Sequence, residues 1–142
     1  MGRIMAVDYG LKRTGLAVTD ENQQFAFALE TVPTGTVFTY LEKYFSQHPV
    51  DAIVVGEPRR LNNTPTDSTP AVEAFIRGLQ RRFPSMPVHR MDERFTSGMA
   101  KQAIIDSGVA RKGRRDKSMV DMVSAAIILQ SWLQQREFRA GL

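Results

Sequence analysis

Residues 4–18, IMAVDYGLKRTGLAV, run from an apolar stretch through a carboxylate and two glycines into a second apolar stretch. The first stretch, IMAV, is too short for a helix and too apolar for a surface loop, so it predicts a strand that is buried on both faces. Gly10 and Gly15 bracket the basic residues Lys12 and Arg13. This pattern predicts a turn of several residues that joins two antiparallel strands.

Asp8 lies at the end of the first predicted strand. Core packing does not explain an acid at the end of a buried strand. One interpretation is that its carboxylate accepts hydrogen bonds from turn amides, as aspartate often does beside glycine. The other is that it belongs to a site built from several carboxylates. The choice depends on whether other acids converge on it.

The rest of the chain alternates between strand and helix patterns. Further strands are predicted at 23–32, 52–56 and 88–91, and helices at 36–47, 69–83, 96–107 and 118–138, with Thr36 and Thr69 as caps. A helix between two strands makes them parallel. The predicted order is βββαβαβαα, an α/β fold with a five-stranded mixed sheet flanked by helices, in a single domain of 142 residues.

Acidic residues follow each of the three strands that we expect to be parallel. Asp8 ends the first, Glu57 follows the second, and Asp92 and Glu93 follow the third. The functional crevice of an open α/β sheet lies outside the carboxyl ends of its strands. The acids should therefore meet at one edge of the sheet.

Asp121, in the motif KSMVDMVSAA, lies near the start of the last predicted helix. Ser118 and Asp121 have the spacing of a capping box, and an acid in a first helical turn suits the helix dipole. Alternatively, Asp121 joins the strand-end acids. Clustered carboxylates repel one another unless cations neutralise them, and they suit Mg²⁺ or Mn²⁺. Such a cluster would bind two divalent cations, which can activate water for attack on a phosphodiester.

Charge is distributed unevenly along the chain. Residues 77–117 contain eleven Lys or Arg against four Asp or Glu, and five of the seven residues from Arg111 to Lys117 are basic. A local basic region is typical of proteins that bind a phosphate backbone, although a solvated charged face has the same composition. The chain has no cysteine, which excludes disulfides and zinc–thiolate sites. Without a signal-peptide or membrane-span pattern, we expect a cytoplasmic protein.

Four motifs, VDYGLKRTGLAV, IVVGEP, MDERFTS and KSMVDMVSAAIILQSWL, together resemble the YqgF (RuvX) family of bacterial nucleases. This family is related to the RuvC Holliday junction resolvases within the RNase H-like superfamily. The resemblance covers essentially the whole chain. It implies an RNase H-like fold, metal-dependent hydrolysis of phosphodiester bonds, and a role in maturation of the 5′ end of 16S ribosomal RNA precursor.

By this resemblance Asp8, Glu93 and Asp121 are catalytic, and the same three residues and Asp92 bind Mg²⁺ or Mn²⁺. Glu57 departs from the family's commonest pattern, in which an apolar residue precedes the proline. An acid at the corresponding strand end is a ligand in the resolvases. Whether Glu57 or the Asp92 and Glu93 pair supplies the middle ligand therefore stays open, with Glu93 favoured.

The resemblance also implies contacts with backbone phosphates. The residues that we expect to make them are all basic: Lys12, Arg13, Arg94, Arg111, Lys112, Arg114 and Arg115. Arg94 has a second interpretation, as an ion-pair partner that positions Asp92 or Asp121. Neither histidine, His48 or His89, is expected to be catalytic.

Rival functions remain. The glycine-flanked Asp8 also resembles the first phosphate loop of sugar kinases and actin-like ATPases, but those proteins need two such domains around the nucleotide. A non-catalytic nucleic-acid-binding module would not need Asp8, Glu93 and Asp121 together. A DNA junction resolvase would act on a two-fold symmetric substrate as a dimer. We expect RNA rather than DNA as the substrate, and either a monomer or a homodimer.

Overall fold

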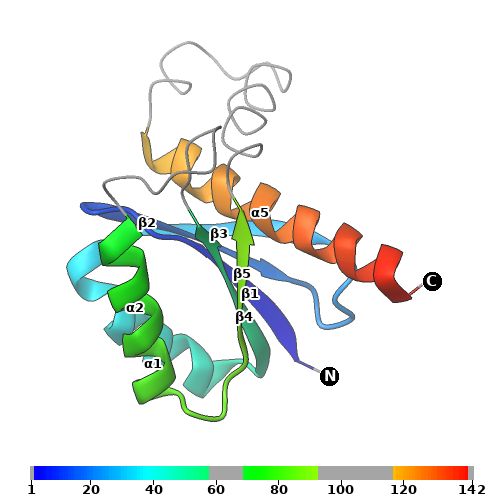
Figure 1. The fold of residues 1–142 in the computed structure, drawn as a ribbon, viewed down its shortest axis with the longest axis horizontal. Coiled ribbons are helices and arrows are strands. Elements are labelled where there is room, and N and C mark those ends of the chain that lie inside the picture. Colours follow the sequence, from blue (N-terminus) through cyan, green and yellow to red (C-terminus); the bar gives the residue numbers. More distant parts are fainter. Residues whose placement is uncertain (1, 58–68, 93–116, 141–142) are drawn as a thin grey trace.

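The structure, a computed structural model, describes residues 2–57, 69–92 and 117–140, with the side chains of residues 119–137 in the last segment. The described part of the chain forms one five-stranded sheet, one short 3-10 helix and three α-helices (Figure 1). The elements are β1 (Arg3–Asp8), β2 (Arg13–Thr19), β3 (Ala26–Pro33), η1 (Thr34–Thr36), α1 (Val37–Gln47), β4 (Val50–Glu57), α2 (Thr69–Arg82), β5 (Val88–Asp92) and α5 (Lys117–Ala140).

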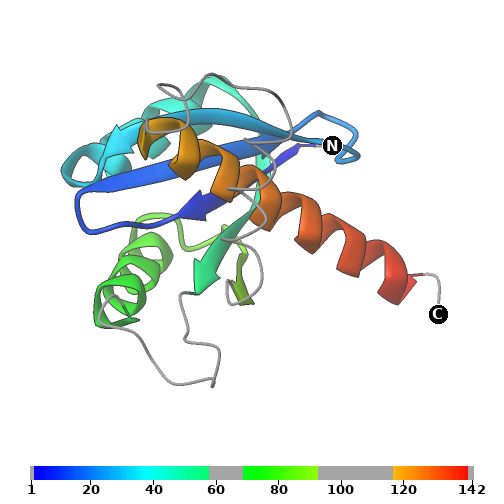
Figure 2. The same ribbon diagram turned by 90° about the horizontal axis from the view of Figure 1, so that it is seen from above.

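The strand order in the sheet is β3-β2-β1-β4-β5. β2 is antiparallel to both β1 and β3, whereas β4 is parallel to both β1 and β5. The predicted mixed sheet, its opening antiparallel pair and its parallel crossovers are confirmed. The carboxyl ends of β1, β4 and β5 consequently lie at the same edge, where Figure 2 also shows the first turns of α5.

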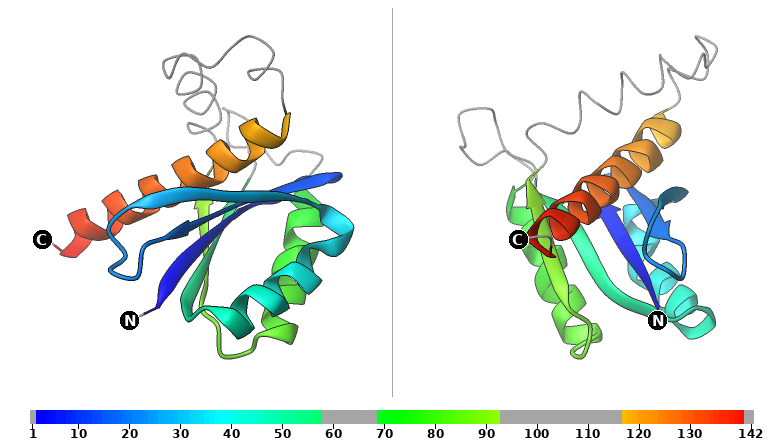
Figure 3. Two further views of the ribbon diagram at one scale, coloured as in Figure 1. Left: turned by 180° about the vertical axis from the view of Figure 1, so that it is seen from behind. Right: turned by 90° about the vertical axis from the view of Figure 1, so that its right-hand side faces the viewer.

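The sheet lies between α1 and α2 on one side and α5 on the other (Figure 3), with an apolar cluster on each side. One cluster contains Met5, Val7, Ile53 and Val55 and packs against α1 and α2, and the other contains Ile4, Ala6 and Val54 and packs against α5. Successive strand residues point to opposite faces, so a strand covered on both sides must be apolar at every position. This double coverage explains the uninterrupted IMAV and AIVV runs.

The helices predicted at 36–47 and 69–83 each bury an apolar face. Val37 and Leu41 of α1 are buried, as are Val72, Phe75 and Leu79 of α2. Along the described residues, no helix is long and apolar enough to cross a membrane.

Some predicted boundaries were wrong. β3 begins at Ala26 and not at residue 23, and the rings of Phe25 and Phe27 are more than half exposed. The Thr36 hydroxyl donates to the Pro33 carbonyl oxygen at 2.9 Å and does not cap α1. The 3-10 helix η1 connects β3 directly to α1. The start of α1 therefore does not depend on a side-chain cap. The helix predicted at 96–107 lies outside the described residues.

Candidate active site

Asp8 ends β1 and lies directly opposite Gly15 of β2 in the antiparallel register. Residues that face each other across two strands point to the same side of the sheet. Asp8 also follows Ile4 and Ala6 at the two-residue period of the strand, and both of those residues pack towards α5. The half-buried Asp8 carboxylate therefore lies on the α5 side of the carboxyl edge.

α5 approaches the sheet closely at Gly15. A Cβ atom on Gly15 would lie 2.0 Å from the carbonyl oxygen of Asp121 and 2.4 Å from its carbonyl carbon. These are backbone atoms of a long helix, which cannot turn aside as a side chain can. Only glycine permits this approach. Because Gly15 is the cross-strand partner of Asp8, the backbone of Asp121 lies over the strand next to Asp8.

Asp121 is the fifth residue of α5, because the helix begins at Lys117. It therefore lies beyond the first turn, and the capping-box interpretation, which placed Ser118 at the cap, was wrong about this position. Its carboxylate instead accepts a hydrogen bond from Nε of Arg13 at 2.9 Å, and 22 % of its side chain is exposed. The charge of Arg13 thus offsets the charge of Asp121 across 108 residues of sequence.

The turn between β1 and β2 is held from the side by Thr34. The Thr34 hydroxyl donates to the carbonyl oxygen of Gly10 at 2.6 Å and is 2.9 Å from the hydroxyl of Thr14. The Thr34 amide donates to the carbonyl oxygen of Lys12 at 3.0 Å. Sequence reasoning missed both threonines, since no local pattern signals a contact with a turn more than twenty residues away. This bracing fixes the path of the chain between Asp8 and Arg13.

Glu57 and Asp92 are paired in the parallel register of β4 and β5. Glu57 follows Val55 at the strand period, so it points to the side of α1 and α2. There Oε1 of Glu57 lies 3.7 Å from the guanidinium of Arg90, which also binds Glu73 of α2 through two nitrogens, one of them at 3.0 Å. The structure therefore places Glu57, and by the same alternation Asp92, on the opposite face from Asp8.

The positive charge of Arg90 offsets the negative charges of Glu57 and Glu73. The hydrogen-bonded carboxylate of Glu73 raises the pKa of the Arg90 guanidinium above its ordinary value, and the nearby charge of Glu57 adds to this effect. A cation already occupies the place between these two carboxylates. This arrangement is typical of a structural ion-pair network that ties α2 to the sheet.

The other expected site residues are placed as follows. Lys12 is exposed in the β1–β2 turn, and Arg13 contacts Asp121 as described. His48 and His89 pack against Tyr44 and Trp132, respectively. Six expected residues lie outside the described part of the chain: Glu93, Arg94, Arg111, Lys112, Arg114 and Arg115.

Within the described residues, no three acidic or histidine side chains form a group that could hold a metal ion. Asp8 and Asp121 supply two carboxylates on one face of the sheet. Their oxygen donors suit hard cations such as Mg²⁺ or Mn²⁺. A hard cation bound by one or two carboxylates completes its coordination shell with water molecules and substrate phosphate oxygens.

Comparison with solved structures supports the fold. The chain superimposes on RuvC of Thermus thermophilus in complex with a Holliday junction substrate with a TM-score of 0.60, over 96% of each chain and at 16% identity. At this identity the likeness shows the fold alone. The RNase H-like architecture expected from the sequence motifs is thus confirmed.

Comparison with sequences identifies the family. A protein of Christiangramia forsetii is 50% identical over 95% of this chain and its own full length, and one of Parabacteroides distasonis is 48% identical over 98% of this chain and 99% of its own. Both are named for a proposed pre-16S rRNA nuclease activity. Residues 2–135 match the model of the RuvX family, which is described as a Holliday junction resolvase. The chain therefore belongs to the RuvX family.

Proposed function

We propose that this protein is a metal-dependent nuclease that hydrolyses phosphodiester bonds in the precursor of 16S ribosomal RNA. The observation that carries the proposal is the approach of Asp121 to Asp8 over Gly15, at the carboxyl edge of the sheet. The names of the relatives supply the substrate class. This substrate would place the activity in the cytoplasm.

The proposed metal ligands are Asp8 and Asp121, completed by Glu93 from the MDER motif. When bound, Mg²⁺ or Mn²⁺ would supply an activated water and would stabilise the leaving oxygen. We propose no ligand role in this site for Glu57, because it faces Arg90 on the other side of the sheet. The same alternation argues against Asp92.

The protein's own groups prepare this site in three ways. Gly15 sets the distance between helix and sheet, and Thr34 fixes the turn that follows Asp8. Arg13 holds the Asp121 carboxylate in one orientation and offsets its charge. Bracing of this kind matters because a displacement of about 1 Å in a catalytic group can lower a rate by about 100-fold.

Phosphate binding is proposed for a set of basic residues. Lys12 is exposed beside it, and Arg94 and the basic segment of residues 111–117 are carried over from the sequence interpretation. Contacts of this kind position a nucleic acid without reading its sequence. Selection of the cleavage site would then depend on the shape of the RNA.

Cleavage assays test the proposal directly. The panel consists of a 5′ precursor fragment of 16S ribosomal RNA, an unrelated single-stranded RNA and a four-way DNA junction, each with and without Mn²⁺. We expect metal-dependent cleavage of the precursor, loss of cleavage with Asp8→Asn, and normal cleavage with Glu42→Gln, a matched change at an exposed acid of α1.

The second candidate is a DNA junction resolvase, which the description of the family model and the fold of RuvC favour. Preferential cleavage of the four-way junction would select it over the RNA nuclease. Activity that is retained in Asp8→Asn would refute the proposed site for either substrate.

A further inference from the structure

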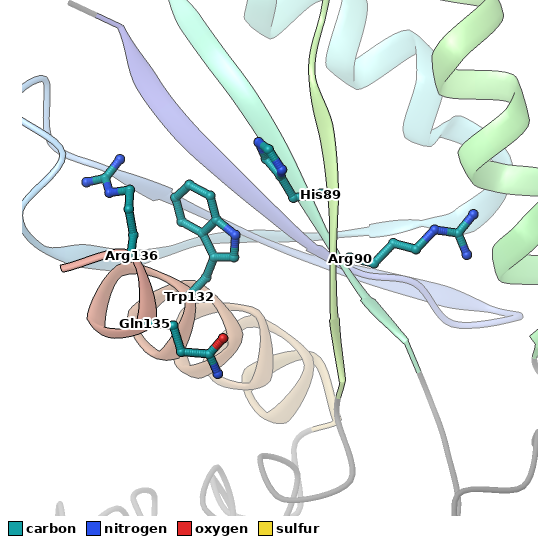
Figure 4. A pocket seen from close by; sticks show the side chains of 5 residues that line it. All are labelled: His89, Arg90, Trp132, Gln135 and Arg136. Carbon is teal, nitrogen blue, oxygen red and sulfur yellow. The ribbon is translucent and has the colours of Figure 1, made fainter. Parts of the chain in front are cut away.

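A hollow of about 210 Å³ lies between α5 and β5, away from the carboxyl edge (Figure 4). We call it the α5–β5 hollow. His89, Arg90, Trp132, Gln135 and Arg136 line it. Its volume is below the roughly 300 Å³ at the lower end of ligand pockets, so it suits one ring system better than a larger ligand.

Flat, electron-rich or cationic groups gather at this hollow. The imidazole of His89 and the indole of Trp132 lie with their ring centroids 5.2 Å apart, and Cζ of Arg136 lies 5.2 Å from the indole centroid. Figure 4 shows the side chain of Arg90 pointing away from these three groups. Its guanidinium is held by Glu73, so the charge available at the hollow is that of Arg136.

Arg136 is fixed in place before any ligand arrives. Two of its nitrogens donate to the side-chain oxygen and the carbonyl oxygen of Gln23, at 2.8 and 3.1 Å. Gln23 itself adopts a φ of 58° in the β2–β3 turn and donates to the carbonyl oxygen of Gly2. A preorganised guanidinium loses little conformational freedom when it binds an anion.

No carboxylate is present among the described residues that line the hollow. An aromatic face, a cation and the exposed amide of Gln135 together match the parts of a nucleotide. We propose that the α5–β5 hollow binds one base of a single-stranded nucleic acid, stacked on Trp132, with the adjoining phosphate at Arg136. Stacking on aromatic side chains is the usual way in which proteins hold unpaired bases.

The hollow lies within reach of the proposed active site, on whose function this inference rests. Trp132 follows Asp121 by eleven residues of continuous helix, which corresponds to roughly 16 Å along α5. A few nucleotides of extended strand can cover that distance. The hollow would thus hold an unpaired flank of the substrate while another part of the strand is cleaved.

The chain contains a single tryptophan, so its fluorescence reports on this hollow alone. The full chain, in EDTA, is titrated with a short single-stranded RNA, a single-stranded DNA of the same sequence and the corresponding RNA duplex. We expect saturable quenching with single strands and none with the duplex. Preference between the two single strands identifies the natural source of the base. Absence of quenching, or equal quenching by the duplex, would overturn the proposal.

Substitutions test the same contact without relying on tryptophan fluorescence. Trp132→Leu should weaken binding of labelled single-stranded RNA by roughly 5- to 140-fold, the range for loss of one stacked base. The salt dependence of binding should not change, because a base contact releases no counterions. Gln134→Ala, at the exposed neighbouring position on α5, is the matched control and should bind as wild type does. Thermal melts by circular dichroism establish that each variant is folded.

These measurements exclude metal and do not require cleavage, so they separate the two proposals. If single strands quench the fluorescence but the protein cleaves no substrate, the proposal that the hollow binds a base is supported and the nuclease proposal is refuted. Normal cleavage without quenching would refute the hollow alone. Unchanged affinity in folded Trp132→Leu would also refute it and would leave the hollow as a packing feature.

Discussion

The substitution Gly15→Ala tests the central contact of the proposed active site. The added methyl group would meet the carbonyl oxygen of Asp121 at 2.0 Å, whereas carbon and oxygen without a covalent bond normally stay at least about 3.3 Å apart. The helix must therefore retreat by more than about 1 Å. Overpacking of this kind costs about 1–3 kcal/mol of unfolding free energy. The same movement takes Asp121 away from Asp8, and we expect cleavage to fall by about 100-fold.

The assay combines urea unfolding with cleavage of the RNA precursor at a temperature at which the variant is fully folded. Gly35→Ala is the matched control, since no atom lies within 4 Å of a Cβ at Gly35. It should keep its stability within about 0.5 kcal/mol and retain normal cleavage. If Gly15→Ala is as stable and as active as wild type, the close approach of α5 to the sheet is refuted.

Three further changes alter charged side chains. Asp121→Asn should diminish the increase in Tm that Mn²⁺ induces in wild type, because a lost ligand weakens binding to the native state; an undiminished increase would make Asp121 structural. Arg13→Gln should lower metal-free stability by at most about 1 kcal/mol and lower the affinity for Mn²⁺ in calorimetric titrations, since it releases the Asp121 carboxylate from its fixed orientation; unchanged or higher affinity would contradict this bracing role. A variant of the basic segment should bind RNA with a flatter salt dependence, by about 0.7 units of slope for each lost phosphate contact, and an unchanged slope would leave the segment without a binding role. That variant carries alanine at Arg111, Lys112, Arg114 and Arg115.

Much of the fold could be predicted from local sequence patterns. The runs IMAV and AIVV predicted buried strands, and the helix between them predicted their parallel arrangement. These signals are reliable because a doubly covered strand must be apolar at every position. The boundaries of β3 were less predictable, because an edge strand with exposed phenylalanines lacks the polar alternation that usually marks a solvent face.

The same doubly buried strands concealed which face each acid occupies. A strand with one polar face reveals by its pattern where the next residue points. β1 and β4 are apolar on both faces, so their sequences do not indicate which face the acid at the strand end occupies. The separation of Asp8 from Glu57 therefore emerged only from the register and from the ion pair with Arg90.

Arg13 shows a second limit of sequence reasoning. Beside Lys12 in a glycine-flanked turn, it has the composition of a phosphate contact. Its observed partner, Asp121, lies 108 residues away, and no spacing rule links such positions. The family resemblance assigned Arg13 to phosphate binding and Asp121 to the metal site, and it did not indicate that the two side chains contact each other.

The attachment of α5 also determines when during synthesis this protein can become active. Polar contacts that hold the helix reach back to β2, to β3 and to the turn between them: from Asp121 to Arg13, from Gln130 to Ala26 and from Arg136 to Gln23. All five strands precede it in the chain and leave the ribosome first. A nascent chain can thus form its sheet while it still lacks one proposed metal ligand and its only tryptophan. Translation of α5 would thus complete the proposed metal site, and before that point the growing chain would be unable to cleave RNA.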